Sequence, residues 1–179
     1  MSGTLQLRNR QRTRALNLPL LRRLIRQLLV RHFQVAQFEL CFHFIGREEM
    51  AALNETFLQH AGSTDVITFD HSEPATRPPQ PGTAWHGEIF ISLDDAVAQA
   101  RQFRTTWQAE VIRYLEHGLL HLAGWDDLEP RKRRKMKREE HRLLQCLAAD
   151  FSLAQLARPS RPAATVPTTA SPGFPVKPR

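Results

Sequence analysis

The sequence predicts an α+β domain with four strands and about five helices. In four short segments, apolar residues alternate with polar ones, which is the period of a strand with one buried face. In five longer segments, apolar residues recur every three or four positions, which is the period of a helix packed on one side. The chain has 179 residues, of which 41% are hydrophobic, and this is enough for one packed core.

The predicted strands are short runs rich in β-branched and aromatic residues. They span 4–8, 38–44, 64–70 and 87–92. The second run is the clearest, because its phenylalanines alternate with Glu39, Cys41 and His43. We therefore expect His43 to face solvent.

The predicted helices begin at proline or at capping-box patterns and carry apolar stripes. They span 20–33, 47–58, 92–103, 105–124 and 130–147. Ser92 with Asp95 and Thr105 with Gln108 form the two boxes. The fourth helix has few polar residues after Glu116, so we expect it to be central and mostly buried.

The formal net charge is +7, and the cations come in blocks. Residues 1–31 contain eight arginines and no acid, and residues 131–138 contain seven cations in eight positions. A polyanion such as nucleic acid would bind such blocks, and a solvated helix face would look the same. Composition alone leaves these two readings equally open.

The domain prediction is a single metal-dependent hydrolase domain over 1–157 followed by a disordered, basic, proline-rich tail over 158–179. No apolar run approaches the length of a membrane span, so we expect no membrane association and a cytoplasmic location. Cys41 and Cys146 are the only cysteines, and we expect both to be reduced and partly buried.

The fourth predicted helix carries the motif with the clearest chemistry, HGLLHLAGWDD at 117–127. His117 and His121 are four residues apart, so their rings lie on one helix face. Gly124 can adopt the left-handed conformation that ends a helix, and the returning chain would bring Asp127 to the same point. Three such ligands suit a catalytic zinc ion. The alternatives are hydrogen-bonded core histidines and an aspartate that only caps the next helix.

The spacing matches the zinc-protease pattern H-E-x-x-H-x-x-G-x-x-H, with a carboxylate as the third ligand. Position 118 is glycine, however, so the glutamate that acts as general base in those proteases is missing. Glu116 would point roughly 100° away from His117 around the helix, which makes it a poor substitute. Peptide hydrolysis is therefore disfavoured.

The motif resembles the signature of the YbeY endoribonuclease and ribosomal RNA maturation factor family, H-G-x-L-H-L-x-G-Y-D-H. STDVITFD at 63–70 and GEIFIS at 87–92 are also similar to segments of that family, and the resemblance covers residues 4–150. It implies a zincin-like α+β fold with a four-stranded mixed sheet and a metal site at the end of a central buried helix. It further implies one Zn²⁺ per chain and cleavage of single-stranded RNA.

Carried over to this sequence, the resemblance assigns the metal to His117, His121 and Asp127, with Asp127 in place of the family's third histidine. This replacement lowers the charge of the site by one and makes zinc-bound water somewhat less acidic. The family usually places an arginine implicated in activity at the position of Leu58. Arg47, His60 or a residue of the basic blocks would then supply the positive charge near phosphate, and no other catalytic residue is assigned.

The interpretation we favour is a zinc-dependent endoribonuclease that acts in ribosomal RNA processing, including 3′-end maturation of the small-subunit RNA, and in ribosome quality control. Its partners would be single-stranded and ribosomal RNA and the small ribosomal subunit; the oligomeric state is left open. The first alternative is a non-enzymatic assembly factor, stabilised by zinc, that binds ribosomal RNA. A zinc hydrolase of peptides or small molecules is the second alternative, which leaves the many cations unexplained.

Overall fold

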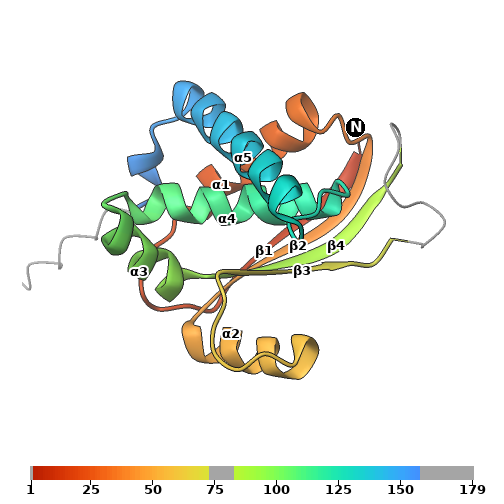
Figure 1. Ribbon diagram of the computed structural model, residues 1–179. Helices are drawn as coiled ribbons and strands as arrows, with labels where there is room; N and C mark the ends of the chain where they lie inside the picture. The colour runs from red at the N-terminus through yellow and green to blue at the C-terminus, as the bar shows by residue number, and fades with distance from the viewer. Residues whose placement is uncertain (1, 73–82, 158–179) are drawn as a thin grey trace, which may run out of the picture.

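A four-stranded mixed sheet forms the centre of the computed structural model, which describes residues 2–72 and 83–157 (Figure 1). Its strand order is β1-β2-β4-β3. The first three strands in this order run parallel, and β3 pairs antiparallel with β4. The strands are β1 (Ser2–Asn9), β2 (Gln37–Ile45), β3 (Val66–Asp70) and β4 (Trp85–Ser92). The predicted α+β class with a four-stranded mixed sheet is confirmed.

Five α-helices cover the two faces of this sheet unequally. They are α1 (Leu18–Gln27), α2 (Arg47–Leu53), α3 (Leu93–Phe103), α4 (Trp107–Leu122) and α5 (Pro130–Asp150). Figure 1 shows α4 crossing one face together with α1 and α5, whereas α2 lies against the opposite face. The first two helices each continue into one π-helical turn, Leu28–His32 and Asn54–Leu58, and Leu153–Leu156 forms a 3₁₀ turn.

Capping side chains define where the helices begin. The Asn17 side chain accepts a hydrogen bond from the Leu20 amide at the start of α1, and Ser92 caps α3 as predicted. The box predicted at Thr105 is displaced by one residue, because Thr106 is the residue whose hydroxyl accepts from the Ala109 amide, at 3.2 Å. The Thr105 hydroxyl donates to Glu110 instead. The start of α4 is therefore Trp107.

The main core lies between the sheet and the helices α1, α4 and α5. It includes Phe42, Ile89, Leu115 and Leu119, all fully buried. A second, smaller cluster fills the space under α2 on the opposite face and consists of Ile45, Met50, Ile67 and Phe90. The apolar stripe of α4 thus faces the sheet, and the prediction that this helix is central and mostly buried is confirmed.

The prediction that His43 faces solvent is wrong, because only 3% of the surface of this residue is exposed. Its ring stacks on Phe90 with the ring centroids 4.2 Å apart, and its Nε2 lies 2.8 Å from a carboxylate oxygen of Glu88. Strand alternation places His43 on the face opposite α4, and the prediction assumed that this face was open. Packing against Phe90 and Arg10 closes it at this position.

Gly118 brings α4 unusually close to the sheet. A Cβ atom at this position would lie 2.7 Å from a methyl carbon of Ile89 and 3.1 Å from the Thr68 hydroxyl. Real side chains do not tolerate the first of these distances without a shift of their neighbours. The glycine between the two histidines of the motif is therefore explained by packing.

Several other predictions concern the edges of the domain. The long loop expected over 71–86 lies between β3 and β4, but residues 73–82 are outside the described residues, as is the predicted tail at 158–179. Both cysteines are free thiols; Cys41 is half-buried as expected, whereas Cys146 is exposed, contrary to the prediction. Within the described parts of the chain, no helix is long and apolar enough to cross a membrane.

Candidate metal centre

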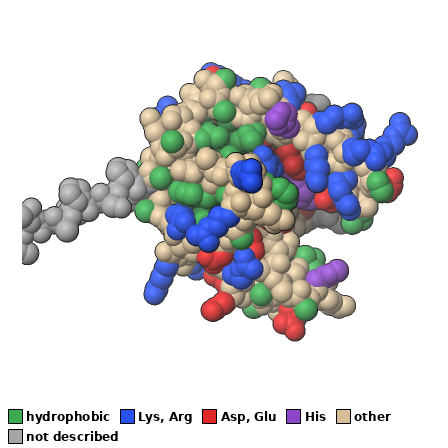
Figure 2. Space-filling model, turned by 60° about the vertical axis from the view of Figure 1, so that its left-hand side comes forward, with side chains coloured by type: hydrophobic (Ala, Val, Ile, Leu, Met, Phe, Trp, Pro, Cys, Tyr) green, Lys and Arg blue, Asp and Glu red, His purple; other side chains and the backbone are tan. Residues whose placement is uncertain are grey.

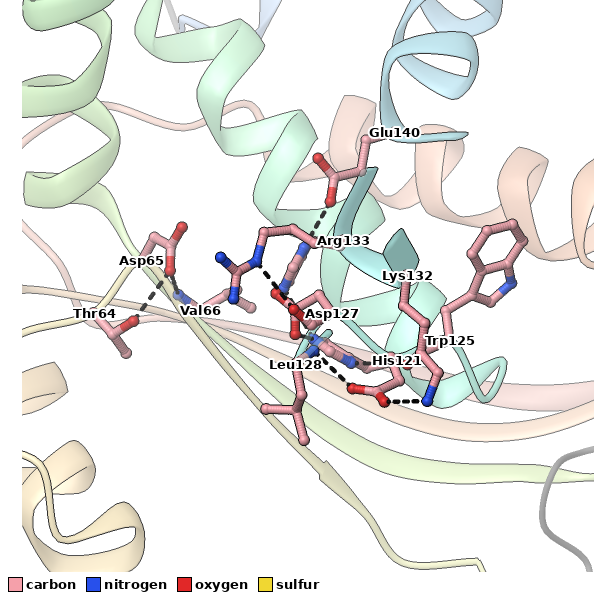
Figure 3. A network of polar contacts seen from close by, with 12 residues as sticks. Thr64, Asp65, Val66, His121, Trp125, Asp127, Leu128, Lys132, Arg133 and Glu140 are labelled. Atoms are coloured by element: carbon pink, nitrogen blue, oxygen red, sulfur yellow. Dashed lines mark hydrogen bonds and ion pairs between the residues drawn. The ribbon is translucent and has the colours of Figure 1, made fainter. Parts of the chain in front are cut away.

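The end of α4 brings His117, His121 and Asp127 together (Figure 3). The two histidine Nε2 atoms lie 2.9 Å apart. After α4, Gly124 takes a φ of +83°, which reverses the chain, as its predicted role requires. Asp127 then returns with its Oδ1 atom 4.0 Å from His121 Nε2. One donor atom from each of the three side chains lies within 4.8 Å of the other two.

The second nitrogen of each histidine ring is occupied by an oxygen acceptor. His117 Nδ1 lies 2.7 Å from Glu140 Oε1, and His121 Nδ1 lies 3.1 Å from the Trp125 carbonyl oxygen. Because both acceptors are oxygens, the Nδ1 atoms carry the protons and donate them. The Nε2 atoms of both rings are therefore the ones turned toward each other and toward Asp127.

The pKa values of the two histidines are shifted in opposite directions. Burial lowers the pKa of His117, but its hydrogen bond to Glu140 and the charge of that carboxylate outweigh burial and raise the pKa above its ordinary value. Burial lowers the pKa of His121, and the neighbouring His117 lowers it further. At neutral pH, His121 is therefore a neutral imidazole, the form that binds metals.

The neighbouring Asp126 has a different role from Asp127. Its Oδ1 accepts from the Leu128 amide at 2.9 Å, and its Oδ2 lies 3.1 Å from Lys132 Nζ. These two partners hold the pKa of Asp126 below its ordinary range. Asp126 therefore stabilises the turn before α5.

The cluster opens onto a cavity of about 590 Å³ between α4 and α5. His117, Asp127 and Glu140 contribute to its lining, and so do the cations Arg113, Arg133 and Lys137. Figure 2 shows Lys and Arg side chains gathered beside a hollow in which acidic and histidine side chains are visible. The candidate centre is thus accessible from one side, beside a cavity whose lining carries both cations and carboxylates.

The cations that the sequence proposed in place of Leu58 lie elsewhere. Arg47 forms an ion pair with Asp95 at 2.6 Å, and His60 is exposed on the segment after α2. Leu58 itself is 47% exposed. None of these three residues lines the cavity beside His117. A residue of the second basic block, Arg133, does so.

Glu116 is fully buried, and neither of its carboxylate oxygens has a hydrogen-bond partner among the described residues. Burial, together with the charge of Glu140, raises the pKa of Glu116 to about 9, so it is protonated at neutral pH. It does not line the cavity. This buried position away from the cavity agrees with the expectation that Glu116 is a poor general base.

Sequence reasoning missed Glu140, the acceptor that orients His117. Its signal lies in the apolar stripe of α5, where the buried residues are Met136, Glu140, Leu143 and Leu147. These positions are spaced by four, three and four residues, so Glu140 interrupts a helix face that should be apolar. A carboxylate on such a face needs a buried partner, and in this structure the partner is His117.

Fold and site together define a class, namely α+β proteins in which a central helix carries paired histidines and turns back at a glycine to add a carboxylate. Within that class, the chain belongs to the YbeY family. The family model described as Endoribonuclease YbeY matches residues 6–148. The recognition made from the motif at 117–127 is confirmed.

Individual relatives support this assignment. The Endoribonuclease YbeY of Chlorobium phaeovibrioides is 35% identical over 109 residues, which cover 61% of this chain and 68% of that protein. The Endoribonuclease YbeY of Salinibacter ruber is 39% identical over 93 residues, which cover 51% of this chain and 59% of that protein. The Endoribonuclease YbeY of Anaeromyxobacter sp. is 37% identical over 131 residues, which cover 73% of this chain and 65% of that protein. The last two matches therefore span less than two thirds of each relative.

A solved structure supports the fold alone. The solution structure of TM1509 from Thermotoga maritima superposes with a TM-score of 0.59 and covers 89% of this chain and 100% of its own. Its sequence is only 20% identical to this one.

Proposed function

We propose that this protein is a zinc-dependent endoribonuclease that cleaves single-stranded RNA in ribosomal RNA processing. Membership in the family described as Endoribonuclease YbeY supports an RNA hydrolase that acts in this process. The observation that carries the proposal is the convergence of His117, His121 and Asp127 beside a cavity that cations from α4 and α5 help to line. The finer assignments, which are 3′-end maturation of small-subunit RNA, ribosome quality control and a cytoplasmic location, are part of the same proposal.

The donor set suits zinc in kind and in spacing. Histidine nitrogens and carboxylate oxygens bind zinc at ~2.0–2.2 Å, so two ligands of a tetrahedral site lie about 3.3 Å apart. The candidate atoms lie 2.9 Å and 4.0 Å apart, on either side of this value. Small side-chain rotations would therefore seat one ion per chain.

The protein residues supply orientation and protonation state. Glu140 and the Trp125 carbonyl accept the Nδ1 protons and so keep both Nε2 atoms directed at one point, where they would bind the metal. Three protein ligands leave a fourth position for water, and bound zinc would lower the pKa of that water toward ~7 and stabilise charge on a phosphoryl oxygen. This combination supports phosphodiester hydrolysis.

The shape and charge of the cavity favour a single RNA strand. Lys137 and Arg133 lie along one side of the opening, on the same face of α5. Cations placed in this way bind the phosphates of a polyanion. A recessed site admits a flexible strand with unstacked bases more readily than a stiff duplex.

The test combines metal analysis of the purified protein with cleavage of a labelled single-stranded RNA and of its matched duplex. We expect about one zinc ion per chain and cleavage of the single strand that a chelator removes and added zinc restores. His117→Ala is the inactive control. Zinc and RNA binding without cleavage would support the assembly-factor alternative, and cleavage that survives chelation would contradict the role of zinc.

A further inference from the structure

Four cations of α5 fall into two groups by what they contact. Lys132 lies 3.1 Å from Asp126 and 2.8 Å from Glu129, and Lys135 lies over the Trp125 ring at 5.1 Å from its centroid. These two side chains are engaged with the protein surface. Arg133 and Lys137, four residues apart and therefore on one helix face, line the cavity beside the candidate metal centre.

Arg133 is held in place without being neutralised. Its Nε donates to the backbone carbonyl oxygen of Asp127 at 3.0 Å, and Figure 3 shows its side chain extending beside Asp127 toward Asp65. Within residues 2–72 and 83–157, no carboxylate pairs with its guanidinium. Arg113, by contrast, lies on the same cavity and is paired with Glu110 at 2.9 Å. Of these two arginines, only Arg133 has no carboxylate partner among the described residues and is therefore available to a ligand.

The position of this charge matters for the chemistry. Hydrolysis of a phosphodiester forms a P–O bond to water oxygen and breaks the ester P–O bond. Water loses a proton and the leaving oxygen gains one. Negative charge accumulates on the non-bridging phosphoryl oxygens meanwhile, and a fixed cation beside them lowers the barrier. A guanidinium keeps its protons at any physiological pH and presents two parallel N–H donors to a phosphate.

We propose that Arg133 is a catalytic residue, whose terminal guanidinium nitrogens bind the non-bridging oxygens of the scissile phosphate, while Lys137 binds a neighbouring phosphate of the same strand. This assignment rests on the proposed function of the His117 centre. The hydrogen bond from Nε to the Asp127 carbonyl fixes the guanidinium in advance, so little reorganisation accompanies substrate binding. The same bond links the position of the cation to the residue that would hold the metal.

The experiment compares Arg133→Gln and Arg133→Lys with Arg101→Gln, an exposed cation of α3 that does not line the cavity. We expect Arg133→Gln to lower kcat by roughly 10²–10³-fold, the loss typical of one charge-stabilising donor. Arg133→Lys should recover part of this loss, and Arg101→Gln should leave kcat unchanged. Zinc content should stay near one per chain in all three variants.

Two further readouts separate catalysis from structure. Added guanidinium ion should partly restore cleavage by Arg133→Ala, because it can occupy the vacated site. The slope of log affinity against log salt for a single-stranded RNA should become shallower by about 0.7 in Arg133→Gln, as expected when one phosphate contact is lost. Arg101→Gln should keep the wild-type slope.

A loss of zinc that parallels the loss of activity in Arg133→Gln would overturn the catalytic role and show that the residue only supports Asp127. So would a kcat within about threefold of that of Arg101→Gln, given the ~10²-fold effect expected. A wild-type protein that fails to cleave RNA would overturn the proposed function and, with it, the catalytic role. In that case an unchanged salt slope in Arg133→Gln would also refute phosphate binding by this residue.

Discussion

Two buried or partly buried histidines each contact a glutamate, on opposite faces of the same sheet. His117, on the α4 side, lies 2.7 Å from Glu140 through Nδ1. His43, on the α2 side, lies 2.8 Å from Glu88 through Nε2. The two contacts have nearly the same length, and the pairs differ in what surrounds the second nitrogen of each histidine ring.

The second nitrogen of His43 is already used. Its Nδ1 lies 3.2 Å from Arg10 Nη1, and because arginine only donates, this nitrogen accepts. The second nitrogen of His117 faces His121 and the cavity. A histidine–glutamate pair is therefore a candidate ligand only where the fold leaves the other ring nitrogen open beside further donors.

The largest expected effect separates the two histidines directly. His117→Ala should lose the zinc ion and all chelator-sensitive cleavage, because two remaining donors bind zinc weakly. His43→Ala should keep both and lose only stability. Elemental analysis and an RNA cleavage assay measure this difference. Stoichiometric zinc in the double variant His117→Ala/His121→Ala would disprove the ligand assignment.

The carboxylate of the candidate centre comes next in expected size. Asp127→Asn should weaken zinc binding severely, since a neutral amide is a poor zinc ligand, and Asp127→His should retain zinc, since imidazole suits it well. Asp126→Asn should have a smaller effect, because its contacts are with the turn and Lys132. Competition with a metal-sensitive dye gives the affinities. A larger loss for Asp126→Asn than for Asp127→Asn would show that the third ligand is wrong.

The glutamates of the two pairs should differ by a smaller factor. Glu140→Gln removes the charged acceptor that orients His117, and such changes typically lower metal affinity by about 10–100-fold. Glu88→Gln, the matched change beside His43, should leave metal affinity unaltered. The same dye competition tests both variants. Equal affinities for Glu140→Gln and wild type would mean that the hydrogen bond to His117 does not contribute to metal binding.

Glu116 is a buried glutamate whose carboxylate has no hydrogen-bond partner among the described residues. Its pKa is raised to about 9 from 4.5 by burial, so between these values the folded protein binds more protons than the unfolded chain. The free energy of unfolding should therefore fall as pH rises through this window, by at most roughly 1.4 kcal/mol per pH unit. Glu116→Met, which fills a similar volume without a charge, should remove this dependence.

Urea unfolding at pH 5, 6.5 and 8 measures the effect of Glu116→Met, which should be largest at pH 8 and smallest at pH 5. Glu139→Gln is the control, because the pKa of Glu139 is shifted the other way and its contribution should be constant from pH 5 to 8. Arg142 holds the pKa of Glu139 below its ordinary value, so this carboxylate stabilises the fold above that range. A difference in unfolding free energy between wild type and Glu116→Met that is the same at all three pH values would contradict the protonated state of Glu116.

Local patterns were sufficient to predict most of the architecture and the three residues of the candidate centre. Strand alternation, helix stripes and the turn at Gly124 are all properties of neighbouring residues, and His117, His121 and Asp127 lie within eleven positions of one another. Glu140 and Arg133 come from the next helix, and their approach depends on how α5 packs over α4. The burial of His43 depends on what covers the second face of the sheet. Such contacts between distant elements leave little trace in the local pattern.

The contact between Gly118 and Ile89 has a consequence for how this site can evolve. A glutamate between the two histidines would convert the motif to the protease type, and a single codon change can introduce it. The β-sheet blocks this route, because any Cβ at 118 meets the Ile89 side chain at 2.7 Å. Descendants of this protein would need a smaller residue at Ile89 first, so new reactions are more accessible through substitutions in α5 and in the cavity wall than through the helix that carries the histidines.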